Sequence, residues 1–312
     1  MTHKVNRPLV GLALGGGGAR ALAHIGILEV LERETIPIDF ICGTSMGGVI
    51  ACAYAAGQTP VSMKKVALEF SELRNLVRLL DVLPHRRGLI EGQRVRELMM
   101  HMIGETRTFA ELRIPCAVTG VDLISGQAMV FRSGSVADAV MMTSAFPGIF
   151  QPVALDDRLI VDGGILNNVP ADVARMLGAD VVIAVDVSPR LSGTITEGKM
   201  HFDPLLPGIF PSFLSDFYRA EMIMIEGLVA ERLKDARPEI LLHPAVPNDL
   251  TIFLGFPRAA EAIEAGVASA ERAIPEIKHA VRPGARYYWM KIQRWLRKVN
   301  VEDCERNLMG RG

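Results

Sequence analysis

The sequence lacks a strong charge of either sign. Its 312 residues include 34 lysines and arginines and 35 aspartates and glutamates, which gives a formal net charge of −1 at pH 7. A protein that binds nucleic acid through the phosphate backbone presents a basic surface, and this composition supplies no excess of positive charge for one. We therefore expect no nucleic-acid partner.

Cysteine is scarce as well. The chain has four cysteines with no Cys-x-x-Cys spacing and no nearby pair of histidines: Cys42, Cys52, Cys116 and Cys304. The sequence therefore predicts neither a zinc site nor a disulfide framework. Cysteine usage of this kind fits a reducing compartment, so we expect a cytoplasmic protein.

Long hydrophobic runs are missing too. No apolar stretch reaches the roughly 18 residues that a transmembrane helix requires. An apolar run starts at Pro8 after basic residues, as in a signal peptide, but Arg20 and His24 interrupt it. Hydrophobic residues nevertheless make up 49% of the chain, so a sizeable core is expected. We predict one large α/β domain over residues 1–280 and a basic amphipathic helix and tail over residues 281–312.

The first 50 residues predict alternating strands and helices. Residues 9–14 form a continuous apolar run that ends at glycines, a pattern typical of a buried parallel strand. A helix is expected over residues 19–34, a second strand over 38–41 and a second helix over 49–56. Alternation of this kind indicates a parallel sheet with crossover helices.

The second strand leads into a Gly-x-Ser-x-Gly turn. In a nucleophile elbow, such a turn forces one serine onto a sharp bend between a strand and a helix. Gly43 and Gly47 provide the tight backbone that the bend needs. The N-terminus of the following helix would favour developing negative charge at Ser45. We therefore predict that Ser45 is a nucleophile, the alternative being an ordinary glycine-rich turn.

The four glycines at residues 15–18 allow two interpretations. A dinucleotide-binding loop needs an acidic residue at the end of the second strand, but that strand ends in the serine turn and Asp39 lies near its start. Alternatively, Gly15 begins a loop whose backbone N–H groups converge on an oxyanion, with the N–H of Met46 as a further donor. We favour the oxyanion hole. Arg20 could stabilise this loop, contact an anionic head group or lie in solvent.

A serine nucleophile needs a base, which in the common triad is a histidine. Among the histidines that follow the elbow, His243 is the best candidate. Pro244 beside it indicates a strand end, and a structural or surface role is the favoured interpretation. The sequence therefore contains no histidine that is a convincing base for Ser45.

Asp162 is the stronger candidate for the base. It ends an apolar strand and is followed by Gly163 and Gly164, which allow close backbone access. A carboxylate can serve directly as a base if desolvation raises its pKa. Asp186 and Asp122 also end strands, but neither has the glycine turn, so we expect them to cap turns.

Three further segments bear on the site. Residues 145–152 predict an extended apolar loop that could line a hydrophobic channel or simply pack in the core. Residues 192–216 show no clean periodicity and are interpreted as a mobile loop or lid over the site. Residues 214–233 predict a helix.

Four of these motifs together resemble the patatin-like phospholipase family. They span most of residues 8–190 and are Gly15 to Arg20, Gly43 to Gly47, Ser144 to Gly148, and Asp162 to Gly164. Residues 247–266 also resemble the bacterial members. The resemblance implies a three-layer α/β/α sandwich with a mainly parallel central sheet. It also implies a Ser–Asp dyad without histidine, and ester hydrolysis without a metal or other cofactor.

The resemblance also assigns roles to individual residues. It implies Ser45 as nucleophile and Asp162 as base, with an oxyanion hole made by Gly16, Gly17 and Gly18. One departure is Ala21, where the family usually has glycine after the arginine. Because alanine adds only a methyl group and suits a helix, we expect the site to be retained.

The expected activity is that of a serine acyl-hydrolase that cleaves the carboxylic ester bonds of phospholipid or lysophospholipid. The intact Ser45 and Asp162 argue against the first alternative, a catalytically weak or inactive regulatory or adaptor protein with the same fold. A nucleotide-dependent oxidoreductase is the second alternative.

Residues 285–299 form the most distinctive segment outside these motifs. They combine an apolar face, a basic face without acidic residues, and both tryptophans of the chain. This pattern is typical of a helix in a membrane interface, although a C-terminal helix packed on the core would also explain it. We expect contact with an anionic membrane surface, at the inner face of the membrane.

Overall fold

The computed structural model describes residues 6–69, 71, 103, 107–189, 193–196, 199–202, 212–248, 250, 255–284 and 287–288. Its strands are β1 (Val10–Leu14), β2 (Phe40–Gly43), β3 (Cys116–Asp122), β4 (Ala128–Phe131), β5 (Val153–Leu155), β6 (Arg158–Asp162), β7 (Val181–Val185), β8 (Gly193–Thr196), β9 (Lys199–Phe202) and β10 (Ile240–Leu242). Its α-helices are α1 (Ala23–Arg33), α2 (Met46–Ala55), α3 (Pro60–Glu69), α6 (Val136–Thr143), α7 (Gly164–Asn167), α8 (Ala171–Leu177), α9 (Ser212–Ala236) and α10 (Ala259–Ala280). Short 3-10 helices are η1 (Gly18–Leu22), η2 (Phe109–Glu111) and η3 (Phe256–Arg258).

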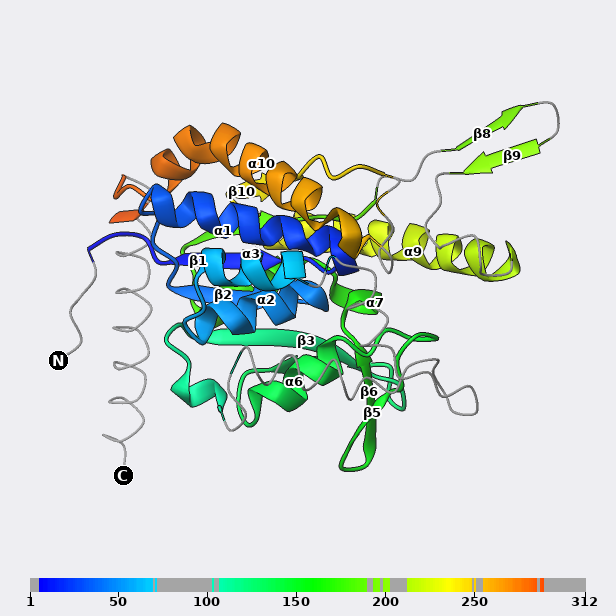
Figure 1. The fold of residues 1–312 in the computed structure, drawn as a ribbon. Coiled ribbons are helices and arrows are strands. Elements are labelled where there is room, and N and C mark those ends of the chain that lie inside the picture. The colour runs from blue at the N-terminus through cyan, green and yellow to red at the C-terminus, as the bar shows by residue number, and fades with distance from the viewer. Residues whose placement is uncertain are drawn as a thin grey trace, which may run out of the picture.

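Within these residues, one mixed sheet of eight strands forms the centre of the molecule. Its strand order is β10-β7-β1-β2-β3-β6-β5, and β4 pairs with β3 off this path. Helices cover both faces of the sheet (Figure 1). The predicted three-layer α/β/α sandwich is therefore confirmed.

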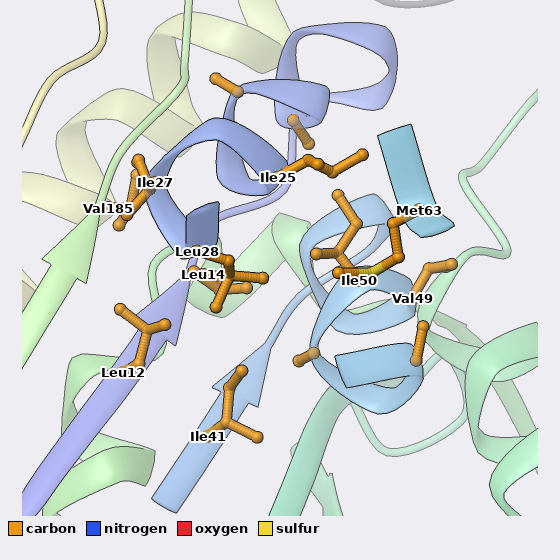
Figure 2. Packing of buried hydrophobic residues seen from close by; sticks show 14 of the residues in the cluster. Leu12, Leu14, Ile25, Ile27, Leu28, Ile41, Val49, Ile50, Met63 and Val185 are labelled. Atoms are coloured by element: carbon orange, nitrogen blue, oxygen red, sulfur yellow. The ribbon is translucent and has the colours of Figure 1, made fainter. Parts of the chain in front are cut away.

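The two faces of the parallel strands carry side chains of different size. Leu12 and Leu14 of β1 and Val185 of β7 belong to the larger core cluster, together with side chains of α1, α2, α3, α6 and α10 (Figure 2). The opposite face carries mainly small residues and packs against α8 and α9. A Cβ atom at Gly11 would lie 2.6 Å from the Cβ atom of Ala179, so this face allows a close approach. Alternating large and small residues along each strand thus set the spacing of the two helical layers.

The sheet is parallel from β10 to β3 and antiparallel at its other edge. Gly43 at the end of β2 pairs with Val118, so β3 runs on for four residues beyond β2. β6 returns along this extension and places Asp162 opposite Gly120. The antiparallel strand therefore ends close to the level of the serine turn, an arrangement that the sequence did not predict.

Helices α1 and α10 cross at two glycines. A Cβ atom at Gly26 would collide with the carbonyl group of Ile263, and one at Gly266 would collide with the carbonyl group of Ala23. The two backbones are therefore in direct contact. This contact fixes α1, which follows directly on the glycine loop.

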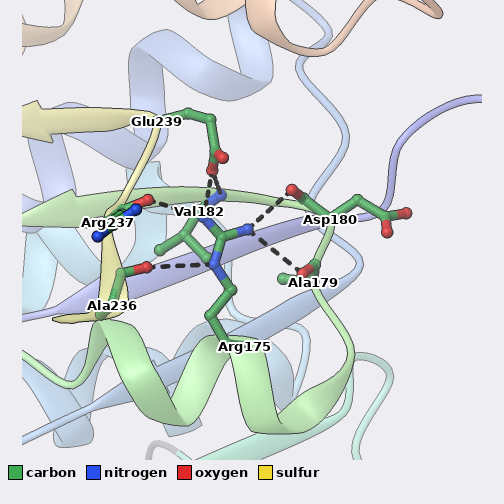
Figure 3. A network of polar contacts seen from close by, with 7 residues as sticks. All are labelled: Arg175, Ala179, Asp180, Val182, Ala236, Arg237 and Glu239. Atoms are coloured by element: carbon green, nitrogen blue, oxygen red, sulfur yellow. Dashed lines mark hydrogen bonds and ion pairs between the residues drawn. The ribbon is translucent and has the colours of Figure 1, made fainter. Parts of the chain in front are cut away.

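Arg175 ties the end of α8 to the segment between α9 and β10 (Figure 3). Its Nη1 donates to the carbonyl of Asp180 at 2.8 Å, and its Nη2 donates to the carbonyl of Arg237 at 2.8 Å and to Glu239 Oε2 at 2.6 Å. The same Oε2 accepts the N–H of Val182 at 2.8 Å. The C-terminal end of α9 is thereby anchored to the central sheet.

Two predicted segments differ from the structure or lie outside its described part. Residues 192–216, predicted as a mobile loop or lid, contain the antiparallel pair β8 and β9. The predicted helix over 214–233 is confirmed as α9. Of the predicted amphipathic segment 285–299, only Tyr287 and Tyr288 are described. The basic helix and the domain division at residue 281 therefore stay predictions. Among the described helices, none is both long enough and apolar enough to cross a membrane.

Candidate active site

Ser45 lies on the sharp turn between β2 and α2. Its backbone has φ 54° and ψ −133°, a conformation that non-glycine residues rarely adopt. Its N–H donates to Thr143 Oγ1 at 2.9 Å. A Cβ atom at Gly47 would collide with the carbonyl of Leu14, and one at Gly43 with the backbone of Gly47. The flanking glycines therefore permit the close contact that holds Ser45 in this strained position.

Asp162 is almost fully buried, with 1% of its surface exposed. Burial raises the pKa of its carboxyl group to about 7, and hydrogen bonding by the Ser45 hydroxyl and the Gly164 N–H offsets part of that rise. Gly164 N–H donates to Oδ1 at 2.8 Å. Oδ2 makes no hydrogen bond of standard geometry within the described residues. Among side chains, the Ser45 hydroxyl is thus the group that interacts with the Asp162 carboxyl group.

Thr119 of β3 connects the serine turn to the aspartate turn. Its Oγ1 lies 2.6 Å from Thr44 Oγ1, and Thr44 Oγ1 donates to the carbonyl of Asn167 at 2.8 Å. A Cβ atom at Gly163 would collide with Thr119. The double glycine thus lets the Asp162 turn pack directly on this threonine, a role that the sequence gave no reason to assign.

The glycine loop lies beside Ser45, since a Cβ atom at Gly16 would be 3.0 Å from the Cβ atom of Ser45. The N–H of Gly16 donates to the carbonyl of Asn168 at 3.1 Å, so it is not free to bind an oxyanion. The backbone N–H groups of Gly17, Gly18 and Met46 have no recorded acceptor in the described chain. The N–H of Gly16 thus holds the loop against Asn168. The oxyanion hole itself stays a prediction.

Arg20 is buried beneath the loop and binds backbone carbonyl groups. Nε donates to Val187 at 2.9 Å, Nη1 to Pro247 at 2.7 Å and Nη2 to Val246 at 3.2 Å. Burial lowers its pKa to about 10, and the charge of Asp186 opposes this shift. The guanidinium therefore stays charged at neutral pH and ties η1, which follows the glycine loop, to the segments after β7 and β10. The side chain is buried, so Arg20 does not lie in solvent.

His24 supports the loop from within α1. Its Nε2 lies 2.7 Å from the carbonyl oxygen of Gly15, so this nitrogen carries the proton and donates it. Burial lowers the pKa of His24 to about 4, and the imidazole is neutral at pH 7. The one signal of this role in the sequence is a histidine among the apolar residues that begin α1, a few positions after the glycine loop.

The depressed pKa of His24 predicts a loss of stability in acid. The unfolded chain protonates this histidine near its ordinary pKa of 6.5, whereas the folded chain does so only near 4. Stability therefore falls as the pH drops through that interval, by roughly 2 kcal/mol at pH 5. We expect His24→Gln to remove this part of the pH dependence, as measured by urea unfolding at pH 7.5 and pH 5. Equal pH dependence in both proteins would contradict the assignment.

The other candidate bases have structural partners. His243 Nδ1 lies 3.6 Å from Asp186 Oδ2, and Asp186 Oδ1 accepts the N–H of Ser188 at 2.9 Å. The Ser125 hydroxyl donates to Asp122 at 2.6 Å and lowers the pKa of that carboxyl. These aspartates hold turns, as predicted, and the recorded side-chain partner of His243 is Asp186 rather than the elbow serine.

Helix α9 packs near the aspartate turn, against α7 and Phe146. The ring of Tyr218 meets the edge of Phe146, with centroids 5.8 Å apart. Phe146 follows Ala145, whose carbonyl accepts the N–H of Asp162 at 3.0 Å. Glu221 lies one turn after Tyr218 and is half-buried. Sequence reasoning missed both α9 residues, because only the tertiary fold brings this helix to the site.

No group of three or more histidine, cysteine, aspartate or glutamate side chains in the described ranges is arranged to hold a metal ion. Separately, Ser45, Asp162 and the backbone around them offer a hydroxyl group, a neighbouring carboxyl group and N–H donors.

The sheet has helices on both faces, and a strained serine lies on the turn between a parallel strand and a helix. These two features define an α/β protein built around a nucleophile elbow. Comparison with protein families makes this class more specific. The chain belongs to the patatin-like phospholipase family, whose model matches residues 12–175. Members of this family are lipid hydrolases.

Individual relatives agree with this membership. The chain is 29% identical over 228 residues to an NTE family protein of Mycobacterium tuberculosis, covering 73% of this chain and 61% of that protein. It is 32% identical over 185 residues to patatin-like phospholipase domain-containing protein 6 of Homo sapiens, covering 58% of this chain and 13% of that one. The chain thus matches less than two thirds of the length of each of these relatives.

Among solved structures, the chain is similar to VipD from Legionella pneumophila, with 13% sequence identity and a TM-score of 0.43. That alignment covers 88% of this chain and 67% of VipD.

Proposed function

We propose that this protein is a serine acyl-hydrolase that cleaves the carboxylic ester bonds of phospholipid or lysophospholipid. The observation that carries the proposal is the buried Asp162, whose pKa is raised to about 7 beside the strained Ser45. A general base is most effective when its pKa lies near the working pH. Family membership supports a lipid ester as the substrate class.

In the proposed reaction, Ser45 Oγ attacks the ester carbonyl carbon while its proton passes to Asp162. The carbonyl oxygen becomes negatively charged and is bound by the N–H groups of Gly17, Gly18 and Met46. The bond to the leaving alcohol then breaks, and that oxygen takes the proton from Asp162. Water, deprotonated in turn by Asp162, attacks the acyl carbon. The bond between that carbon and Ser45 Oγ then breaks, Oγ takes the proton back from Asp162, and the fatty acid is freed.

Exposed apolar side chains on α9 support a lipid rather than a small polar ester. Phe217, Ile223 and Met224 are 66%, 56% and 63% exposed, on the helix that also carries Tyr218 to the site. Large exposed apolar side chains beside a site are typical of contact with apolar ligands or surfaces. Contact of residues 285–299 with an anionic membrane remains part of this proposal and lies outside the described residues.

Labelling with a fluorophosphonate tests the proposal directly. Wild-type protein should react at Ser45, and Ser45→Ala should not react. Asp162→Asn should lower ester turnover on the order of 10²- to 10⁴-fold, the range typical for loss of a general base. His243→Asn is the matched control and should leave turnover nearly unchanged.

The reverse pattern of these two variants would restore a histidine triad. A wild-type protein that neither labels nor hydrolyses esters would instead favour the inactive regulatory protein. If the wild type does hydrolyse lipid esters, lipid profiling of the products would identify the acyl chain and head group of the substrate.

A further inference from the structure

The amide side chain of Asn168 is buried between three segments that surround Ser45 and Asp162. Asn168 follows directly on α7 and is 9% exposed. A Cβ atom at Gly16 would lie 2.5 Å from Asn168 Oδ1, and one at Gly164 would lie 3.0 Å from the same atom. Asn168 Nδ2 donates to Ser188 Oγ, in the segment after β7, at 3.2 Å. The amide therefore packs against the glycine loop, the aspartate turn and the chain that leaves β7.

Asn168 holds Gly16 through both of its backbone polar groups. The carbonyl oxygen of Asn168 accepts the N–H of Gly16 at 3.1 Å, and Asn168 Nδ2 donates to the carbonyl oxygen of Gly16 at 3.3 Å. Because a carbonyl oxygen only accepts hydrogen bonds, this partner also fixes which end of the amide faces the loop. The first bond holds the peptide unit before Gly16, and the second holds the unit between Gly16 and Gly17.

The second bond determines the direction of the Gly17 N–H. The carbonyl of Gly16 and the N–H of Gly17 belong to one planar trans peptide unit, in which the two groups point in opposite directions. With the carbonyl turned toward Asn168, the Gly17 N–H is directed away from it and has no recorded acceptor in the described chain. A peptide unit between two glycines can rotate at little steric cost, since glycine accepts φ of either sign. The side chain of Asn168 thus selects one of two orientations.

We propose that Asn168 is a positioning residue for the oxyanion hole: its side-chain amide keeps the Gly16–Gly17 peptide unit in the orientation that offers the Gly17 N–H to the substrate. The inference rests on the proposed function, in which this N–H binds the oxyanion. The rotated peptide unit would present the carbonyl oxygen of Gly16 instead, and its partial negative charge would repel the oxyanion. Asn168 therefore acts on the charged transition state more than on binding of the uncharged ester.

Asn168→Ala tests this role with a soluble p-nitrophenyl ester at pH 8. Loss of one net hydrogen bond lets the peptide unit rotate, so kcat should fall about tenfold. KM should change by less than about twofold, because the donor gains its strength only as negative charge develops. The rate of fluorophosphonate labelling at Ser45 should fall by a similar factor, since negative charge also develops on the phosphonyl oxygen. Unchanged kcat and labelling would overturn the proposal.

Asn167→Ala is the matched control. Asn167 is the neighbouring amide and is 5% exposed, but its Nδ2 donates to Asp172 Oδ1 at 2.8 Å rather than to the glycine loop. The same substitution there also removes a buried hydrogen bond, and it should leave kcat and labelling within about twofold of the wild type. An equal loss of kcat in both variants would show that general loosening of this turn is the cause, and would overturn the proposal.

A second variant and a direct measurement cover the case in which Asn168→Ala does not fold. Asn168→Ser keeps a polar group but ends one atom short of Nδ2, so the same loss of kcat is expected. Glycine-selective ¹⁵N labelling follows the Gly17 amide, whose resonance should move downfield on fluorophosphonate labelling in the wild type and less in the variant. Equal shifts in both proteins would refute the role of Asn168. A wild type that neither labels nor hydrolyses would refute the proposed function instead, so the two failures are distinguishable.

Discussion

Asp162→Asn is expected to raise the thermal stability of the protein at the same time as it removes the proposed activity. The pKa of this carboxyl is raised from 3.8 to about 7 by burial. Because the folded pKa is the higher one, the fold loses stability as the pH rises from about 4 through about 7. Above pH 7 the loss is complete and corresponds to roughly 4 kcal/mol. Asparagine carries no charge and retains an oxygen for the Gly164 N–H.

Thermal unfolding of the wild type and of Asp162→Asn at pH 8 and at pH 4 measures this effect. The variant should melt well above the wild type at pH 8, and the two should melt at similar temperatures at pH 4. Ser45→Ala is the control, since it alters the site but leaves the buried carboxyl in place. A stabilisation of equal size at both pH values would show that the buried charge is not its cause.

Gly266→Ala is expected to destabilise the fold by about 3 kcal/mol or more, because the new methyl group would overlap the backbone carbonyl of Ala23. Neither helix can make room by a change of rotamer, so α1 and α10 must separate. The separation would displace the start of α1 and with it the His24 contact to the glycine loop. Reduced fluorophosphonate labelling should therefore accompany the loss of stability.

Gly227→Ala provides the matched control. Gly227 lies within α9, and a Cβ atom there would meet nothing within 4 Å. Alanine has the higher helix propensity, so this variant should be stabilised by up to about 1 kcal/mol. Urea unfolding of both variants measures the difference. Similar effects of the two substitutions would mean that α1 and α10 do not depend on a backbone contact at this glycine.

The parts of the site that the sequence predicted are those that short motifs specify. Ser45 and its flanking glycines occupy a turn whose backbone leaves few alternatives, and the structure reproduces it. The strand that delivers Asp162 was equally visible as an apolar run ending in glycines. In both cases the local requirements of the backbone were sufficient to predict the turn from the sequence.

Other features depend on partners that are distant in the chain. The direction of β6 follows from its pairing with β3, and no local pattern in residues 158–162 encodes that choice. The engagement of the Gly16 N–H depends on Asn168, more than 150 positions away. Nothing in the sequence around Tyr218 indicates that its ring packs against Phe146, which lies more than 70 positions earlier.

Because β3 extends beyond β2 and pairs there with β6, the position of Asp162 tolerates insertions and deletions in the neighbouring hairpin loops. Pairing with Gly120, rather than the length of the intervening chain, fixes the position of Asp162. Residues could be inserted or removed at the hairpin tips around Gly126 and Asp156 without moving the carboxyl group. A slip of one residue between β3 and β6 would instead turn Asp162 to the opposite face of the sheet. The position of Asp162 relative to Ser45 thus depends on strand pairing and not on loop length.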